Sequence, residues 1–378
     1  MQQTVGGFVK MSTLSQFFPS GGGGIPVEVF LVGAGGGGGN SGGYSYRGCG
    51  GGSGQVLYGL YTFDYGKELN VIIGTGGRGS DYSDAQVPEP ALGQPGDPSR
   101  FGALVAHGGG GGGGGVYPGG QWHPLFTERQ NYGSSGGSYF YGPTFTAVCV
   151  NYPKGAEFIM RQIDQYGPIP SSTEAPGTGG VERYGMQNGM IVGRRLTANG
   201  WIATGAGNHT GSSIGAGGGG SGGHPNNSTD SSTDWLGQIS GQSTEWLATG
   251  GQGTPASWIG YPTLEFAGGG GGGTGGPTAV GLGRAGGGDG GYAPYAVNGA
   301  GADATANSGS GGGGGFSGGP SSPPYYNPGG DGGSGCCIIR YPSQYSAATV
   351  TGNASTPPQG PGYHVYRWNG NGTITFNP

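Results

Sequence analysis

Short apolar runs separated by glycine dominate the first third of the chain. In VEVFLV and QVLYGLYTF, large apolar or aromatic residues recur at nearly every second position, as expected of strands with one face on a core. Three further runs are equally short and rich in β-forming residues. The five predicted strands are 27–32, 55–63, 68–73, 100–106 and 336–341. The chain therefore leaves the sheet after Ala106 and returns at Cys336, so we expect a module that is discontinuous in sequence.

Two other patterns predict local structure. In GAEFIMRQIDQYG (155–167), Ile159, Ile163 and Tyr166 fall on one face of a helix that Gly167 could end. A helix of about three turns is marginal alone and would need packing. In HVYRWNGNGTITF (364–376), small or polar residues alternate with larger ones around NGNG, which predicts a β-hairpin.

Composition changes this picture. Of 378 residues, 102 are glycine and 27 are proline, while 32 % are hydrophobic and 9 % are charged. This profile excludes an ordinary globular enzyme core and is typical of low-complexity chains. Glycine is uneven, however: 36 glycines fall in residues 1–115 and only 15 in residues 116–204, a stretch that is instead rich in aromatic residues. Two glycine-rich blocks therefore flank an ordinary one.

The longest glycine runs are 35–39, 108–115, 268–273 and 311–315. They have no side chains to bury, and glycine loses the most backbone entropy on ordering. One interpretation is a set of flexible linkers. The other is a set of extended helices with three residues per turn, whose outward N–H and C=O groups pair with neighbouring helices. Only glycine permits backbones to pack that closely on several sides.

The runs VEVFLVGAGGGGG, GGGSGQVLYGLYTFDYGKELNVIIGTGG, SRFGALVAHGGGGGGGG, ANSGSGGGGG and GGSGCCIIRYP resemble the glycine-rich domain of bacteriophage tail-fibre and adhesin proteins. A similar domain occurs in anaplastic-lymphoma-type receptor kinases. The resemblance implies an all-β fold, in which a jelly-roll-like sheet is interrupted by a bundle of polyglycine-II helices, with few or no α-helices. In that family a segment like YRWNGNGTITF precedes the first core strand, whereas here it lies at the chain's end.

These patterns divide the chain into four parts. They are an N-terminal attachment segment (1–20), the discontinuous glycine-rich module (21–115 and 205–342), an aromatic-rich insertion (116–204) and a C-terminal β-hairpin segment (343–378). The C-terminal segment could complete the sheet in cis, pair with a neighbouring subunit, or begin a further module.

Charge and cysteine content narrow the partners. The net charge of −5 and only three lysines argue against nucleic acid and anionic membranes. We find no secretory signal in MQQTVGGFVKMSTLSQFF and no apolar segment of the roughly 20 residues that a membrane span needs. Cys49, Cys149, Cys336 and Cys337 are a poor basis for disulfides, since two are adjacent, so we expect free, buried thiols made in a reducing cytoplasm.

Catalytic and cofactor motifs are weak. G-x-G-x-x-G recurs, but no copy opens a helix after a strand with a suitable acid downstream, and Glu68 stands where a phosphate-binding loop needs Ser or Thr. Two fragments around Asp289 and Asp331 are similar to calcium-binding repeats but do not repeat in register, so we expect turns there. The five histidines form no zinc-type spacing. We therefore expect no cofactor, no metal and no enzymatic activity.

One catalytic alternative stays open from the sequence. A tailspike-type glycosidase needs two carboxylates that flank a sugar bond. The middle stretch could supply such a pair from four acidic residues, which are Glu157, Asp164, Glu174 and Glu182.

Surface recognition is the chemistry that the sequence favours. Residues 117–141 and 224–238 mix Tyr and Trp with Ser, Gly and Asn, the combination that antibody loops use for adaptable contacts. The candidate receptor-binding residues are Tyr117, Trp122, His123, Tyr132, Tyr139, Tyr141 and Trp235. The alternative is that these aromatic side chains cover the ends of the glycine bundle.

The sequence thus predicts a bacteriophage virion protein, a tail-fibre tip or adhesin that binds a host surface receptor, either an outer-membrane protein or a glycan. We also expect other virion proteins as partners, a homo-oligomer, and release from the host cytoplasm by lysis. The main alternative is a structural role, as a virion decoration or a fibre subunit. Ice binding by a flat glycine face would require regular threonine or small residues at every third position, a pattern that we do not find.

Overall fold

The computed structural model describes about half of the chain in full. The described ranges are 24–40, 48–81, 93–113, 217–218, 220–221, 249–251, 253–261, 263–274, 281–292, 299–316, 327–357 and 362–378. Backbone pairing alone is described for seven short strands, which are β6 (Asn131–Tyr132), β7 (Ser138–Tyr139), β8 (Tyr152–Pro153), β9 (Arg183–Gln187), β10 (Met190–Thr197), β11 (Gly200–Thr204) and β12 (His209–Thr210). The predicted helix at 155–167 lies outside these ranges.

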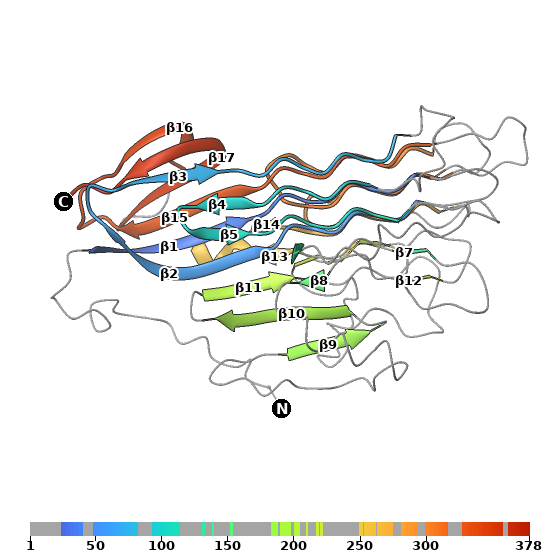
Figure 1. The fold of residues 1–378 in the computed structure, drawn as a ribbon, viewed down its shortest axis with the longest axis horizontal. Helices are drawn as coiled ribbons and strands as arrows, with labels where there is room; N and C mark the ends of the chain where they lie inside the picture. The colour runs from blue at the N-terminus through green and yellow to red at the C-terminus, as the bar shows by residue number, and fades with distance from the viewer. Residues whose placement is uncertain are drawn as a thin grey trace, which may run out of the picture.

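An antiparallel sheet of eleven strands forms one end of the molecule (Figure 1). Its order is β5-β4-β3-β17-β15-β1-β2-β11-β10-β9, with β16 paired to β17. The remaining strands are β1 (Gly24–Val32), β2 (Val56–Asp64), β3 (Glu68–Ile72), β4 (Ser99–Phe101), β5 (Leu104–Ala106), β15 (Cys336–Pro342), β16 (Thr349–Ser355) and β17 (Tyr363–Thr375). The sheet curls until β4 and β5 contact β1 and β2, so it is nearly closed.

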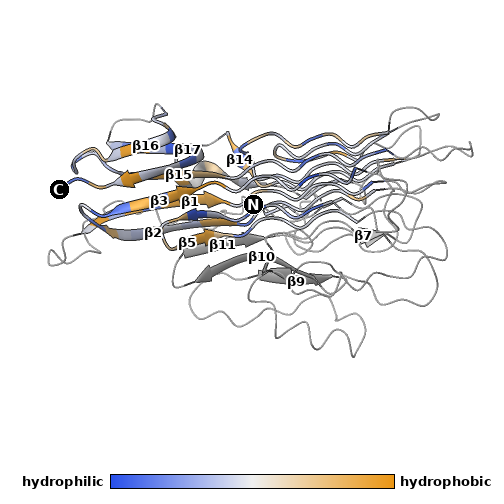
Figure 2. Ribbon diagram, turned by 45° about the horizontal axis from the view of Figure 1, so that its top comes forward, coloured by the Kyte–Doolittle hydropathy of each residue, from blue (hydrophilic) through white to orange (hydrophobic). Residues whose placement is uncertain are grey.

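The five strands expected from the apolar pattern are all present, with 100–106 divided between β4 and β5. Alternation places one set of side chains inside the curled sheet, where Phe101, Trp368 and Phe376 are fully buried. The opposite face carries a second apolar cluster around Phe30 and Ile338. Figure 2 shows this concentration of hydrophobic residues in the strands.

The second cluster is covered by residues 253–267. This stretch contains β13 (Thr254–Pro255), the single helical turn η3 (Ala256–Ile259) and β14 (Glu265–Phe266). Ala256, Ile259 and Phe266 pack on the sheet face beside Phe30, whose ring lies 5.7 Å from that of Phe266. The described residues are therefore mainly β, as expected, and contain no helix longer than this turn.

Glycine-rich segments continue directly from the sheet strands and run side by side along the long axis of the molecule (Figure 1). We call them the glycine bundle, which comprises residues 33–40, 48–55, 73–80, 93–98, 107–113, 267–274, 281–291, 299–316 and 328–335. For example, β1 leads into 33–40, and 48–55 leads into β2. The bundle therefore replaces the loops at one end of the sheet.

Backbone hydrogen bonds hold the bundle together with a period of three residues. In 33–39, the N–H groups of Gly33, Gly36 and Gly39 all donate to one neighbouring segment, 48–55. The intervening N–H groups donate to two further segments, 93–98 and 328–335. The carbonyl groups accept from another three segments with the same spacing, which are 73–80, 107–113 and 309–316. One segment thus bonds to six neighbours.

Two sequence expectations need correction. NGNG lies inside the continuous strand β17 instead of forming a turn, and the hairpin is made by β16 and β17. The register shifts between Gly352 and Ala354, because three residues of β17 (369–371) stand opposite the single residue Asn353 of β16, so the extra residues of this bulge belong to β17. β17 pairs in cis with β15 and β3.

The second correction concerns the middle of the chain. Residues 183–204 were expected to lie outside the sheet, but β11 pairs with β2, and β10 and β9 follow it. β2 is an edge of the core sheet whose N–H and C=O groups need partners, and this meander supplies them.

Candidate functional site

The sequence-predicted recognition residues are not brought together by any described contact. Tyr132 in β6 is paired with Pro153, and Tyr139 in β7 is paired with Thr210, but only these backbone pairings are described. The other candidates lie outside the described residues, and they are Tyr117, Trp122, His123, Tyr141 and Trp235. Receptor binding by these side chains therefore stays a prediction.

The glycine bundle itself has two kinds of segment. Interior segments such as 33–40 and 309–316 are buried along their whole length. A Cβ atom at Gly36 would overlap the carbonyl oxygen of Gly110, and one at Gly313 would overlap that of Asp289. No side chain therefore fits at these glycine positions between the interior backbones.

Outer segments expose series of side chains that are spaced three residues apart. In 73–81 the exposed residues include Thr75, Arg78 and Asp81, and in 299–306 they include Ala300, Asp303 and Ala306. This spacing equals the period of the hydrogen bonds, so residues three apart point to the same side. We call the exposed residues of the outer segments, including those of 281–291 and 328–335, the bundle rim.

Carboxylates on the rim accept hydrogen bonds from backbone N–H groups. Asp331 Oδ1 accepts from the N–H of Gly79 at 2.7 Å, and the N–H of Asp331 donates to Asp303 Oδ1 at 2.7 Å. Asp289 Oδ1 accepts from the N–H of Gly283 at 2.8 Å. Asp289 and Asp331 were expected in turns, but both lie within extended segments.

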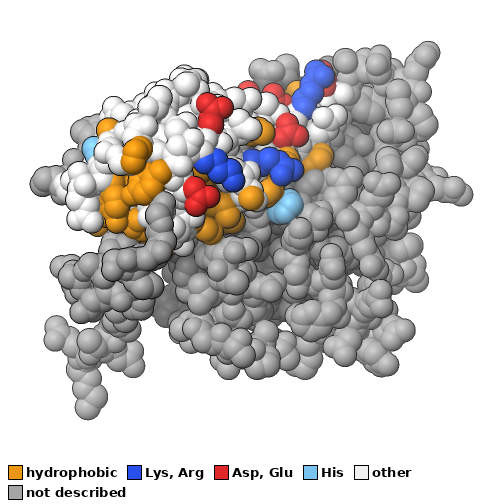
Figure 3. Space-filling model, turned by 60° about the vertical axis from the view of Figure 1, so that its left-hand side comes forward, with side chains coloured by type: hydrophobic (Ala, Val, Ile, Leu, Met, Phe, Trp, Pro, Cys, Tyr) orange, Lys and Arg blue, Asp and Glu red, His pale blue; other side chains and the backbone are white. Residues whose placement is uncertain are grey.

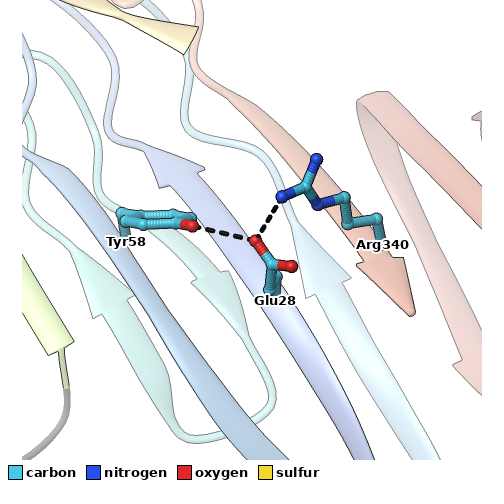
Figure 4. Close-up of polar contacts among 3 residues, drawn as sticks. All are labelled: Glu28, Tyr58 and Arg340. Carbon is cyan, nitrogen blue, oxygen red and sulfur yellow. Dashed lines mark hydrogen bonds and ion pairs between the residues drawn. The ribbon is translucent and has the colours of Figure 1, made fainter. Parts of the chain in front are cut away.

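A polar cluster lies on the same face of the sheet as Phe30 and Ile338. Glu28 is central: its Oε2 accepts from the Tyr58 hydroxyl and from Arg340 Nη2, each at 2.8 Å (Figure 4). Neighbouring strands place the three side chains together, since Glu28 of β1 pairs with Arg340 of β15. The Arg340 guanidinium also lies 5.0 Å from the ring centre of Tyr363.

Burial and charge set the protonation of this cluster. Burial raises the pKa of Tyr58, and the negative charge and hydrogen bond of Glu28 raise it further. Burial opposes the charged form of Arg340, but the hydrogen bond and charge of Glu28 outweigh it, so the pKa of Arg340 is raised. Tyr58 is therefore a neutral donor and Arg340 a permanent cation. The Glu28 carboxylate therefore links three neighbouring strands through Tyr58 and Arg340, and the described residues of the cluster include no second carboxylate with which it could form an acid–base pair.

The surface around this end of the molecule is mixed in character. Figure 3 shows Lys and Arg side chains beside Asp and Glu side chains, with hydrophobic side chains gathered next to them on the described part of this face. Leu60 of β2 and Tyr363 of β17 are 37 % and 38 % exposed. Partly exposed apolar residues are normal on protein surfaces, so these two do not by themselves mark a binding site.

The described residues offer little reactive chemistry. They contain no group of three His, Cys, Asp or Glu residues that could hold a metal ion. Cys336 and Cys337 are free and buried, as expected, and Cys49 is also buried, while Cys149 lies outside the described ranges. Burial raises the pKa of Cys336 to about 12 and raises that of Cys337 well above its usual value, so both thiols stay protonated and unreactive. The four acidic residues of the possible glycosidase pair are outside the described ranges.

The rim aspartates and the Glu28 cluster were not found from the sequence. A signal for the rim exists, because non-glycine residues repeat every third position in GTGGRGSD (74–81) and in NPGGDGGSG (327–335). The Glu28 cluster has no such signal, since its three residues come from strands up to 312 positions apart in the chain.

Comparisons of the chain with protein-family models, with curated proteins and with solved structures found no match. Among the described residues, no helix has the length and hydrophobicity that a membrane crossing requires.

Proposed function

We propose that this chain is a bacteriophage virion protein, a tail-fibre tip or adhesin that binds a receptor on the host surface without catalysis. The observation that supports this most directly is the glycine bundle, in which a segment such as 33–39 bonds to six neighbours. A scaffold held by backbone hydrogen bonds does not depend on side-chain identity in the residues that connect its segments. Such a scaffold suits a protein whose recognition residues vary while its frame stays constant.

The finer architecture belongs to the same proposal. The three-residue period of the hydrogen bonds, with neighbours on six sides, is what packed polyglycine-II helices require. The nearly closed antiparallel sheet, whose strands lead into these segments, is consistent with a jelly roll interrupted by the bundle. Both features agree with the resemblance carried by the glycine runs.

Recognition is assigned to the aromatic side chains of residues 117–141 and to Trp235. Tyr and Trp supply a large contact area at a low cost in conformational entropy, and the intervening Ser, Gly and Asn residues supply adaptable hydrogen bonds. The proposed receptor is an outer-membrane protein or a glycan, and the proposed location is the virion. We also propose that other virion proteins and further copies of this chain are partners.

An adsorption experiment tests this function. Trp122→Ala and Tyr139→Ala, each made in the phage, should reduce adsorption to host cells by at least about tenfold, the effect of losing an interface hot spot. The thermal unfolding midpoint should stay nearly unchanged. Leu60→Ala is the matched control, because Leu60 is an exposed apolar residue on the sheet. Unchanged adsorption, or a large loss of stability in both variants, would instead favour aromatic residues that only cover the bundle.

The position of the protein in the virion separates binding from a structural role. Electron microscopy of the native assembly, with this chain located by a tag or antibody, should find a few copies at the distal end of a fibre. A continuous lattice or an open filament would contradict the adhesin and support a decoration or fibre subunit.

A further inference from the structure

The glycine bundle has outer segments, and these pose a problem that interior segments do not. Each peptide group has one N–H donor and one C=O acceptor. Because the segments have a period of three residues, successive N–H groups of one segment point in three different directions around its axis. An outer segment therefore directs some N–H groups away from its neighbours. By analogy with an open edge of a β-sheet, such groups would bond to any similar backbone that came close.

Side chains meet this need at three described positions. Asp331 accepts the N–H of Gly79, Asp303 accepts the N–H of Asp331, and Asp289 accepts the N–H of Gly283. All three aspartates are exposed, and they belong to outer segments of the bundle. Each carboxylate thus takes the place that a neighbouring carbonyl group fills in the interior.

Segment 299–305 shows how the two sides of an outer segment differ. On the inner side, a Cβ at Gly301 would overlap the carbonyl oxygen of Gly313. On the outer side, Ala302, Asp303 and Thr305 are exposed and carry side chains into solvent. These side chains keep a second backbone at a distance that does not permit the close packing of the interior.

We propose that the bundle rim is a self-association surface that Asp289, Asp303 and Asp331 keep closed, and that the partner excluded is the glycine bundle of a second copy. Two features act together. The carboxylates already occupy outward N–H groups, and their like charges repel the same surface on another copy, in a chain whose net charge is −5. The hydrogen bonds between aspartate side chains and backbone N–H groups that support this surface are independent of receptor binding.

The test replaces the three aspartates together in the full chain. The variant D289A/D303A/D331A should associate beyond the wild-type oligomeric state, with an average mass at least about twice that of the wild type by light scattering, since the smallest new assembly pairs two copies. The mass should rise with protein concentration. A wild-type mass across the concentration range would overturn the proposal.

Two matched variants separate hydrogen bonding from charge. D289N/D303N/D331N removes the charges but keeps an oxygen acceptor, and it should associate less than the alanine variant. D64A/E68A/E265A removes three exposed carboxylates outside the bundle and should keep the wild-type mass. Equal association of this control and the rim variant would overturn the proposal, because loss of net charge would then suffice.

A single substitution keeps the proposal testable if the triple variant does not fold. Asp303→Ala removes one acceptor and leaves Asp289 and Asp331 in place, so it should give a smaller, concentration-dependent rise in sedimentation coefficient. The far-UV circular dichroism spectrum should match that of the wild type. A folded Asp303→Ala protein with a wild-type sedimentation coefficient at all concentrations would contradict the proposal.

Discussion

The sheet and the glycine bundle are stabilised by different parts of the polypeptide. In the sheet, side chains fill the interior: Trp368 and Phe101 are fully buried, with ring centres 6.5 Å apart. In the bundle, hydrogen bonds between peptide groups hold the segments together. The N–H of Gly36 donates to the carbonyl oxygen of Gly52 at 2.8 Å, and the carbonyl oxygen of Gly36 accepts from the N–H of Gly312. One region buries apolar area, and the other satisfies backbone donors and acceptors.

This difference determines how each region responds to mutation. A packed side-chain core can relax around a smaller or similar side chain, so its losses are graded. At an interior glycine of the bundle no neighbouring side chain can move aside, because an added Cβ atom meets the backbone of another segment. The bundle should therefore show an abrupt loss where the sheet shows a gradual one.

The largest effect is expected inside the bundle. Gly111→Val would place a Cβ atom on the carbonyl oxygen of Gly93, so the backbones of segments 93–98 and 107–113 would have to move apart. We expect a loss above about 4 kcal/mol, which for many domains means no folded protein. The measurement is soluble yield followed by urea denaturation. Ala302→Val, at an exposed position of an outer segment, is the control and should change stability by no more than about 0.5 kcal/mol.

Normal yield and stability of the Gly111→Val protein would contradict the close packing on which the comparison depends. A severe loss in both variants would show that valine is poorly tolerated anywhere in the bundle, on its outer side as well. Either result would remove the distinction between interior and outer segments.

The sheet was largely predictable from sequence, and the bundle only in outline. Alternating residues such as Val27 and Val29 indicate a strand, because the side-chain period of a strand is two, although both faces of β1 are buried and Phe30 packs in the second cluster. A run of identical glycines has no alternation that would assign each residue to a particular side of the segment. The sequence of 33–39 does not tell which residue bonds to which neighbour, since any shift along the run leaves the chemistry unchanged.

The misplaced turn at NGNG has a related cause. Asn-Gly is a strong hairpin signal when the strands on both sides pair with each other. Here β15 and β3 pair with the two halves of β17, and the Asn371 side chain accepts a hydrogen bond from the N–H of Ile73. These partners are distant in sequence, so tertiary pairing overrides the local signal. The recognition residues proposed above, such as Trp122, stay untested by the described structure.

An intermediate loss of stability is expected from breaking the ion pair between strands β1 and β15. Glu28 and Arg340 form an ion pair at 2.8 Å, with side chains only 13 % and 19 % exposed. Glu28→Gln keeps the size of the side chain but leaves the guanidinium without its counter-ion, and we expect a loss of about 2 kcal/mol. Urea denaturation at neutral pH measures it.

The bundle supplies the matched control for this prediction. Arg78 and Asp81 lie 3.8 Å apart with side chains 70 % and 53 % exposed. Asp81→Asn should therefore cost no more than about 0.5 kcal/mol, because exposed pairs contribute little. Equal losses at the two sites would mean that burial does not distinguish the sheet pair from the rim pair.

The smallest effect at neutral pH is expected at Tyr61, and pH should enlarge it. The Tyr61 hydroxyl is buried without a hydrogen-bond partner in the described part of the chain. Tyr61→Phe should therefore stabilise the protein at pH 7, by no more than about 1 kcal/mol.

Burial raises the pKa of Tyr61 to about 12, whereas the unfolded side chain has the ordinary pKa of 10.0. Between these values the unfolded wild type loses a proton that the folded protein keeps, so wild-type stability falls as pH rises, and the variant escapes this loss. Urea denaturation at pH 7, below this window, and at pH 11, within it, should show the advantage of the Tyr61→Phe variant growing with pH. Tyr363→Phe, at a tyrosine that is 38 % exposed, is the control variant. A stability difference between wild type and Tyr61→Phe that stays constant with pH would show that the Tyr61 hydroxyl remains hydrated. The inner face of β2 would then be accessible to solvent, as the bundle rim is, and would not belong to the buried core of the sheet.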